Sequence, residues 1–180
     1  MDDDKAVSLA KSVYAEYRDV IDFITSNVES NQFNMACKAF FAKHGFTYEA
    51  STGRSIFFVN SDMREIENWP MQKWLSTHPV CMWFRKNGDS KLGIVIEVGP
   101  IIDTNKRNAL LKSFQEEGFK FQKNAFELGT KYTRVYSEYK EFEDWDEAEL
   151  ITQFLEKLYF EIAKGAIEKT SKILKSIKTQ

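Results

Sequence analysis

The dipeptide Asn87-Gly88 is the feature that most constrains the fold of this chain. It separates two runs rich in apolar, β-branched and aromatic residues, within the segment PVCMWFRKNGDSKLGIVIEV. Asn-Gly favours a tight turn whose two central residues have positive φ angles, and such a turn matches the twist of antiparallel strands. The sequence therefore predicts a β-hairpin over residues 79–98.

Three further segments have the composition of strands. FTYEAST and SIFFVN lie on either side of Gly53-Arg54, and their aromatic and β-branched residues around a turn signal predict a second hairpin. The segment KYTRVYSEY, residues 131–139, is predicted to return as a strand. Because hairpins join antiparallel neighbours, we expect a mostly antiparallel sheet of about five strands.

Two helices are expected before the first strand. Apolar residues recur at steps of three and four from Ala6 to Val28, which is typical of an amphipathic helix. Ser30 or Asn31 is a suitable N-cap for a second helix through QFNMACKAFFAKH. Gly45 follows directly and is expected to end that helix in the left-handed conformation.

Two helices are also expected after the main hairpin. Asp103 or Thr104 is a suitable N-cap for a helix over NKRNALLKSFQEE, and Gly118 is expected to end it. A long helix is predicted roughly from Asp146 to Lys178.

These elements predict an α+β fold. It comprises a mostly antiparallel sheet of about five strands with helices packed on one face, two N-terminal helices and a long C-terminal helix. A chain of 180 residues fits one domain, and its 43% hydrophobic and 14% aromatic residues supply a core of large side chains. We expect a single domain over residues 1–180, with a helical N-terminal part at 1–45 and the sheet with its covering helices at 46–180.

Charge and cysteine content narrow the classes of function. The formal net charge of −2 lacks the strong basicity of many nucleic-acid-binding proteins. Cys37 and Cys81 lie in apolar surroundings and the N-terminus lacks the pattern of a signal peptide, so a reduced, cytoplasmic setting is expected. No apolar run approaches about 20 residues, so no membrane span is expected.

Glu97 is a carboxylate inside the apolar run GIVIEVGPII. Alternation puts the large aliphatic side chains of this strand on the opposite face, so we expect Glu97 to be solvated or paired across strands. A metal-dependent nuclease site of the PD-(D/E)XK type would need a second acid and a nearby lysine. Asp89 is an available acid, but Gly99 occupies the position of the lysine, so no catalytic residue is predicted.

No cofactor or metal site is predicted either. Cys37 and His44 are seven residues apart on one predicted helix, about 10 Å of rise, which is too far for both to bind one zinc ion locally. His78 and Cys81 enter a strand three residues apart and would point to opposite faces. The chain contains no nucleophile elbow, Walker loop or dinucleotide-binding glycine pattern.

The residues best suited to binding are aromatic or basic. Trp69 and Trp74 lie in the irregular segment ENWPMQKWLSTHP, where tryptophan either fills a core or anchors a partner, and they are the predicted protein-binding residues. A second set, of six basic residues, would contact phosphates if its side chains formed one surface. Otherwise these residues would be ordinary solvated cations. This set is Arg85, Lys86, Lys91, Lys106, Arg107 and Arg134.

Several of these segments together resemble a known domain. They are SIFFVN with NWPMQKW, then LGIVIEVGP, DTNKRNALLKSF with its Arg107, KYTRVYSEY, and acidic residues leading into a long helix. From about Ser55 to Lys178 the chain is similar to the C-terminal accessory domain of bacterial PD-(D/E)XK nuclease-family proteins, many of them associated with restriction or phage defence. The resemblance does not include the nuclease core, and it implies a partner-binding or regulatory domain.

We therefore predict a non-catalytic protein-interaction or regulatory domain, acting in bacterial defence or phage counter-defence, whose partner is a second copy or a defence component. The alternative is a nucleic-acid-binding accessory domain that uses the basic hairpin. A third hypothesis is a degenerate metal-dependent nuclease that uses Glu97 and Asp89.

Overall fold

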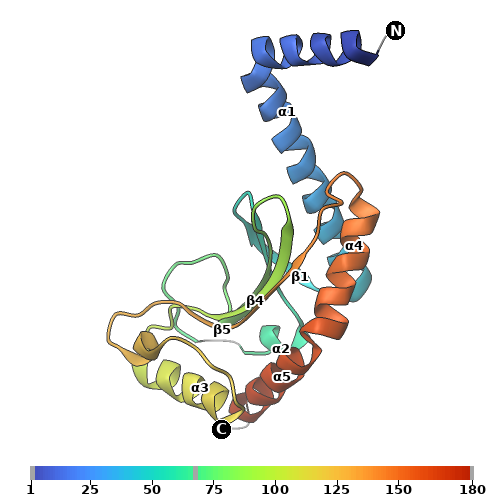
Figure 1. The fold of residues 1–180 in the computed structure, drawn as a ribbon. Coiled ribbons are helices and arrows are strands. Elements are labelled where there is room, and N and C mark those ends of the chain that lie inside the picture. The colour runs from blue at the N-terminus through green and yellow to red at the C-terminus, as the bar shows by residue number, and fades with distance from the viewer. Residues whose placement is uncertain (1–2, 67–68, 179–180) are drawn as a thin grey trace.

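The computed structural model describes residues 3–66 and 69–178, and it has an α+β fold built on one antiparallel sheet (Figure 1). The five strands follow one another in the order β1-β2-β3-β4-β5. Their bounds are Thr47–Ser51, Ser55–Val59, Val80–Lys86, Lys91–Val98 and Thr133–Glu141. The helices are α1 (Asp3–His44), α2 (Ser61–Arg64), α3 (Thr104–Glu116), α4 (Ala148–Lys157) and α5 (Lys164–Lys178), with a 3-10 turn at Lys123–Phe126 and a π-helical turn at Leu158–Ile162. The predicted fold class is confirmed.

Both predicted hairpins form. Strands β3 and β4 pair in register, with Phe84 opposite Ile94, and Gly88 between them has a φ of 65°. The backbone N–H of Asn87 donates to the carbonyl of Lys91 at 2.8 Å, so the connection is longer than a two-residue turn. The β1–β2 hairpin likewise turns at Gly53, which has a φ of 54°.

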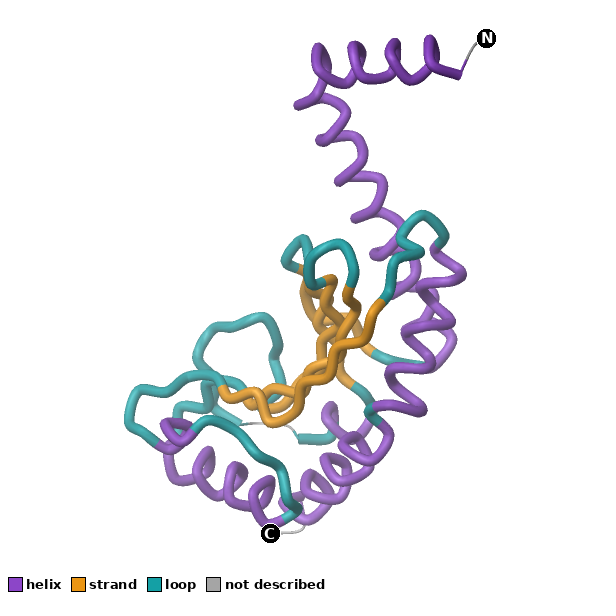
Figure 2. Tube along the Cα trace, viewed as in Figure 1, coloured by secondary structure: helices purple, strands orange, loops and turns teal. Residues whose placement is uncertain are grey.

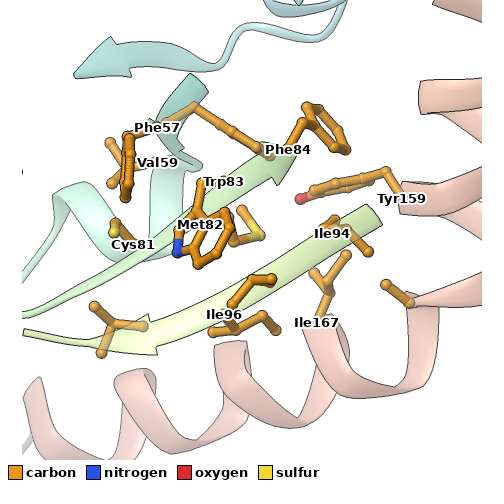
Figure 3. Packing of buried hydrophobic residues seen from close by; sticks show 14 of the residues in the cluster. Phe57, Val59, Cys81, Met82, Trp83, Phe84, Ile94, Ile96, Tyr159 and Ile167 are labelled. Atoms are coloured by element: carbon orange, nitrogen blue, oxygen red, sulfur yellow. The ribbon is translucent and has the colours of Figure 1, made fainter. Parts of the chain in front are cut away.

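The sheet is buried on both faces near its centre. On the helix-covered face, Met82, Phe84, Ile94 and Ile96 are fully buried, and Tyr159 approaches them from the C-terminal helical region (Figure 3). The opposite face carries residues that are also buried, namely Phe57, Cys81, Trp83 and Val95. Side chains of the sheet itself help to cover this second face, because the rings of Phe57 and Trp83 lie 5.5 Å apart.

The N-terminal helical region differs from the prediction. It is one helical run, and its break lies at Tyr17 (φ −115°, ψ 24°) rather than at Ser30 or Asn31. A sharp bend in α1 is visible in Figure 2. No glycine or proline occurs between Asp3 and His44, so nothing in the backbone requires the helix to stop before Gly45.

The C-terminal helix is also not the single long helix that was predicted. Helix α4 runs into the π-helical turn, Ala163 follows with φ −91° and ψ −1°, and α5 then continues in a new direction (Figure 1). A π-helical turn inserts one extra residue, which shifts the side chains that follow around the helix. Leu158 and Tyr159 in this turn are buried in the core, and α5 lies beside α2 and α3.

Across the part of the chain that is described, no helix is both long enough and apolar enough to cross a membrane.

Candidate functional site

The first half of α1 projects away from the rest of the molecule (Figure 1). Every residue from 11 to 18 is exposed, whereas Phe33, Cys37 and Phe40, further along the same helix, are buried against the sheet and α4. The first half of α1 carries exposed large apolar side chains, namely Val7, Leu9, Val13, Tyr14, Tyr17 and Val20.

Four of these side chains, Leu9, Val13, Tyr17 and Val20, are named the apolar stripe. Leu9 and Val13 are four residues apart and lie on one side of the helix before the break, while Tyr17 lies at the break and Val20 just after it. Their exposed fractions are 59%, 43%, 52% and 56%. Several large apolar side chains exposed on one segment are typical of an interaction site.

Trp69 and Trp74, the predicted protein-binding residues, are both half-buried. The ammonium group of Lys106 lies 5.6 Å from the ring of Trp69, which lines a cavity of about 390 Å³ between α3 and α5. The ring of Trp74 lies against Gly99 and is 6.1 Å from the ring of Tyr132. Neither side chain is wholly in the core, and neither projects freely, so their role in binding stays a prediction.

The structure does not gather the six predicted basic residues on one open surface. Arg85 and Arg134 both approach the ring of Trp83, at 5.7 and 5.1 Å. Lys86 lies 4.4 Å from the ring of Trp145, and Lys91 forms an ion pair of 3.1 Å with Glu141. Lys106 lies over Trp69, and Arg107 is buried.

Glu97 lies at the edge of a cavity at the end of the sheet. Its Oε1 is 3.6 Å from Nε of Arg134, and its side chain is 12% exposed, so the expected cross-strand pairing is present. Burial raises the pKa of Glu97, and Arg134 partly opposes that rise. The nearby indole of Trp83 also lowers the pKa of Glu97, by less than Arg134 does. Its N–H forms no hydrogen bond with any described residue.

The cavity beside Glu97 has a volume of about 400 Å³ and is lined by polar and aromatic side chains. Asn124 and Thr130 come from the segment between α3 and β5, and Tyr132 precedes β5. Such a cavity suits a small polar group. Of the residues that the sequence predicted as sites, Glu97 and Arg134 line this cavity, and they are paired with each other.

Asp89 and Glu97 are too far apart to bind one metal ion. Lys91 and Glu97 are six residues apart in β4, a separation of about 20 Å, and Asp89 lies beyond Lys91 in the hairpin turn. A side chain at Gly99, where a nuclease would carry its lysine, would overlap the ring of Trp74.

The cysteines and histidines are also separated. His44 hydrogen-bonds to Glu156 at 3.0 Å, and His78 pairs with Glu49 at 3.6 Å. Burial raises the pKa of both Cys37 and Cys81, which disfavours the thiolate that metal binding and nucleophilic chemistry require. Within residues 3–66 and 69–178, no cluster of three or more histidine, cysteine or acidic side chains is placed to hold a metal ion.

The sequence prediction missed the burial of Arg107. Its neighbours on α3 at steps of three, four and seven are Leu110, Leu111 and Phe114, and all three are fully buried. Arg107 therefore occupies the apolar stripe of its helix, and that spacing was visible in the sequence.

Comparison of the chain with protein-family models, curated proteins and solved structures finds no match in any of the three. The resemblance to the accessory domain of PD-(D/E)XK proteins therefore stays a prediction from the sequence.

Proposed function

We propose that this protein is a non-catalytic protein-interaction domain and that the projecting part of α1 is the element that binds. The observation that supports this is the exposed stripe of Leu9, Val13, Tyr17 and Val20. Burying one such side chain contributes about 1.5–3 kcal/mol, so a partner that covers the stripe is strongly favoured.

The length of the projecting helix also favours a bound state. The segment before the break at Tyr17 begins at Asp3 and has 14 residues. Isolated helices shorter than about 12–15 residues are marginal in water, and most helices in proteins are stabilised by packing of an apolar face. Contact with a partner would supply that packing.

We propose a second copy of the chain as that partner. The two stripes are identical, so a two-fold pairing of α1 with itself places the apolar side chains of one copy against those of the other. The further setting in bacterial defence or phage counter-defence rests on the sequence resemblance alone.

The test is the mass of the protein in solution, measured by light scattering after size-exclusion chromatography over a range of concentrations. The wild type is expected to be a dimer, and Leu9→Glu with Val13→Glu is expected to weaken dimerisation by at least about 100-fold, since two apolar contacts are lost from each copy.

Ala15→Glu is the matched control. It adds a carboxylate to the same exposed stretch but on the opposite side of the helix, so the dimer should persist. A wild type that stays monomeric at about 100 μM would contradict a second copy as partner, because a specific dimer has a far lower dissociation constant.

Nucleic-acid binding is the alternative. The pair of guanidinium groups over Trp83, from Arg85 and Arg134, is the feature that favours it. Binding to labelled single-stranded and duplex DNA should then fall steeply between 50 and 200 mM salt, on the order of 10³-fold for a protein with several phosphate contacts. Binding that is absent or independent of salt would contradict it.

A further inference from the structure

Arg107 is a buried cation whose hydrogen bonds to the described part of the chain go to neutral groups. The residue is 4% exposed and belongs to the first half of α3. Its Nη1 donates to the backbone carbonyl of Ala125 at 2.6 Å, and its Nη2 donates to the hydroxyl of Thr133 at 2.7 Å. Its Nε is buried and has no hydrogen-bond acceptor among the residues described.

This arrangement leaves a positive charge without an anion. Arg107 forms no ion pair with any residue in the described ranges. Burial lowers the pKa of Arg107, but a guanidinium group stays protonated in proteins. A buried charge is costly unless it is paired, so the folded protein gains stability from any anion that can reach this side chain.

Arg107 also lines a cavity that such an anion could enter. The cavity has a volume of about 250 Å³ and lies between the start of α3, the segment after β4 and the segment before β5. Thr104 and Lys131 contribute a hydroxyl and a second cation to the lining, and Leu128 adds an apolar side chain.

Two acidic residues near this cavity favour a monoanion over a dianion. Glu127 lines the cavity, and Asp103 lies at the adjacent end of α3, where its carboxylate accepts hydrogen bonds from the backbone N–H groups of Asn105 and Lys106. These two acids repel a dianion such as phosphate more strongly than a monoanion. A planar carboxylate also matches the fork of donors on a guanidinium group.

We propose that this cavity is a binding site for a carboxylate group and that Arg107 is the cation that binds it. The ligand is a small monocarboxylate, or a carboxylate presented by a larger molecule. This site is independent of the α1 surface, so either proposal can fail without the other.

The test is an NMR titration of the wild-type protein with sodium acetate. The Nε–H signal of Arg107, assigned by its loss in Arg107→Met, should move downfield and saturate, because a carboxylate is a stronger acceptor than water. Acetamide has the same shape without the charge, and it should leave the signal in place, as should sodium chloride at the same ionic strength. No saturable shift with acetate, or an equal shift with acetamide, would overturn the proposal.

Variants locate the site. Lys131→Ala should weaken acetate binding by about two- to fivefold, the range expected for one exposed ion pair, while Arg134→Gln should leave it unchanged. If Arg107→Met does not fold, the backbone signals of Thr104 and Lys131 in the wild type report the same titration. Glu127→Gln should strengthen binding. If the wild type does not respond and only Glu127→Gln does, Glu127 is itself the counter-ion and no external ligand is needed.

Discussion

Glu97 and Arg107 show how the position of a charged residue in its element decides its environment. Glu97 lies on the face of β4 that the helices do not cover, beside Arg134, and keeps a partner and some access to water. Arg107 lies on the covered side of α3, and its partners among the described residues are neutral. The contact between Glu97 and Arg134 is therefore an ordinary cross-strand pair, whereas Arg107 is the residue that an external anion would stabilise.

The pH dependence of stability is expected to reveal the burial of Glu97. Because its folded pKa is raised, the folded state holds this proton more tightly than the unfolded state does. The stability contributed by protonated Glu97 is complete below the unfolded pKa of about 4.3 and is lost as the pH rises through the folded pKa. Glu97→Gln should therefore be at least as stable as the wild type at pH 7, with the difference shrinking toward pH 4.

Urea unfolding of both proteins between pH 4 and pH 7 measures this difference. Glu141→Gln is the matched control, since this acid lies on the neighbouring strand, pairs with Lys91 and is 70% exposed. The difference in unfolding free energy between Glu141→Gln and the wild type should not follow the same pH dependence. A Glu97→Gln protein that is less stable at pH 7 would mean that the contact with Arg134 outweighs the cost of burial.

Among the elements, α3 begins at a well-defined cap. The carboxylate of Asp103 accepts from the backbone N–H groups of Asn105, at 2.9 Å, and Lys106, at 3.1 Å. These groups have no acceptor within the helix, so the cap both satisfies them and fixes where α3 starts. It thereby sets the position of Arg107 one turn later.

Asp103→Ala should lower the free energy of unfolding by about 1 kcal/mol, the usual cost of removing an N-cap. Asp103→Asn should keep most of the stability, because its side-chain oxygen can accept the same bonds. Asp144→Ala, at an exposed acid outside any cap position, is the control and should have little effect. Urea unfolding at pH 7 distinguishes the three, and an Asp103→Ala protein as stable as Asp144→Ala would contradict the role of the cap.

At the scale of the whole molecule, Phe40 joins segments that are far apart in the sequence. It is fully buried on α1. Its ring lies 5.3 Å from that of Phe84 in β3, 6.4 Å from Phe58 in β2 and 5.8 Å from Tyr159 in the C-terminal helical region. The second half of α1 is therefore part of the core of the sheet domain, while the first half projects away from it.

Phe40→Ala should lower the free energy of unfolding by about 3–5 kcal/mol, because it leaves a cavity where these segments meet. Tyr48→Ala removes an aromatic ring that is 50% exposed on the edge strand β1, and it should change stability by no more than about 0.5 kcal/mol. Denaturant unfolding followed by tryptophan fluorescence measures both. Equal effects would mean that Phe40 does not connect the segments.

Local signals predicted most of the elements. Asn87-Gly88 and Gly53 marked both hairpins, and Asp103 and Gly45 marked helix ends, because turns and caps depend on residues within a few positions of one another. The break at Tyr17 and the π-helical turn at Leu158–Ile162 were not predicted, since neither contains a glycine or proline that would require it. The candidate sites were predicted less well, because the partners of Arg107 and the surroundings of Trp69 and Trp74 depend on other elements.

The sequence by itself determined the α+β class, the antiparallel pairing and the aliphatic face of β4, since these follow from periodicity and turn chemistry along the chain. Only the tertiary structure decided which charged and aromatic residues are available for binding. It placed Trp74 over Gly99, separated Asp89 from Glu97 and surrounded Arg107 with neutral acceptors. It also left the stripe of Leu9 and Val13 uncovered. Which groups a buried side chain meets depends on packing between distant segments, and no local pattern specifies it.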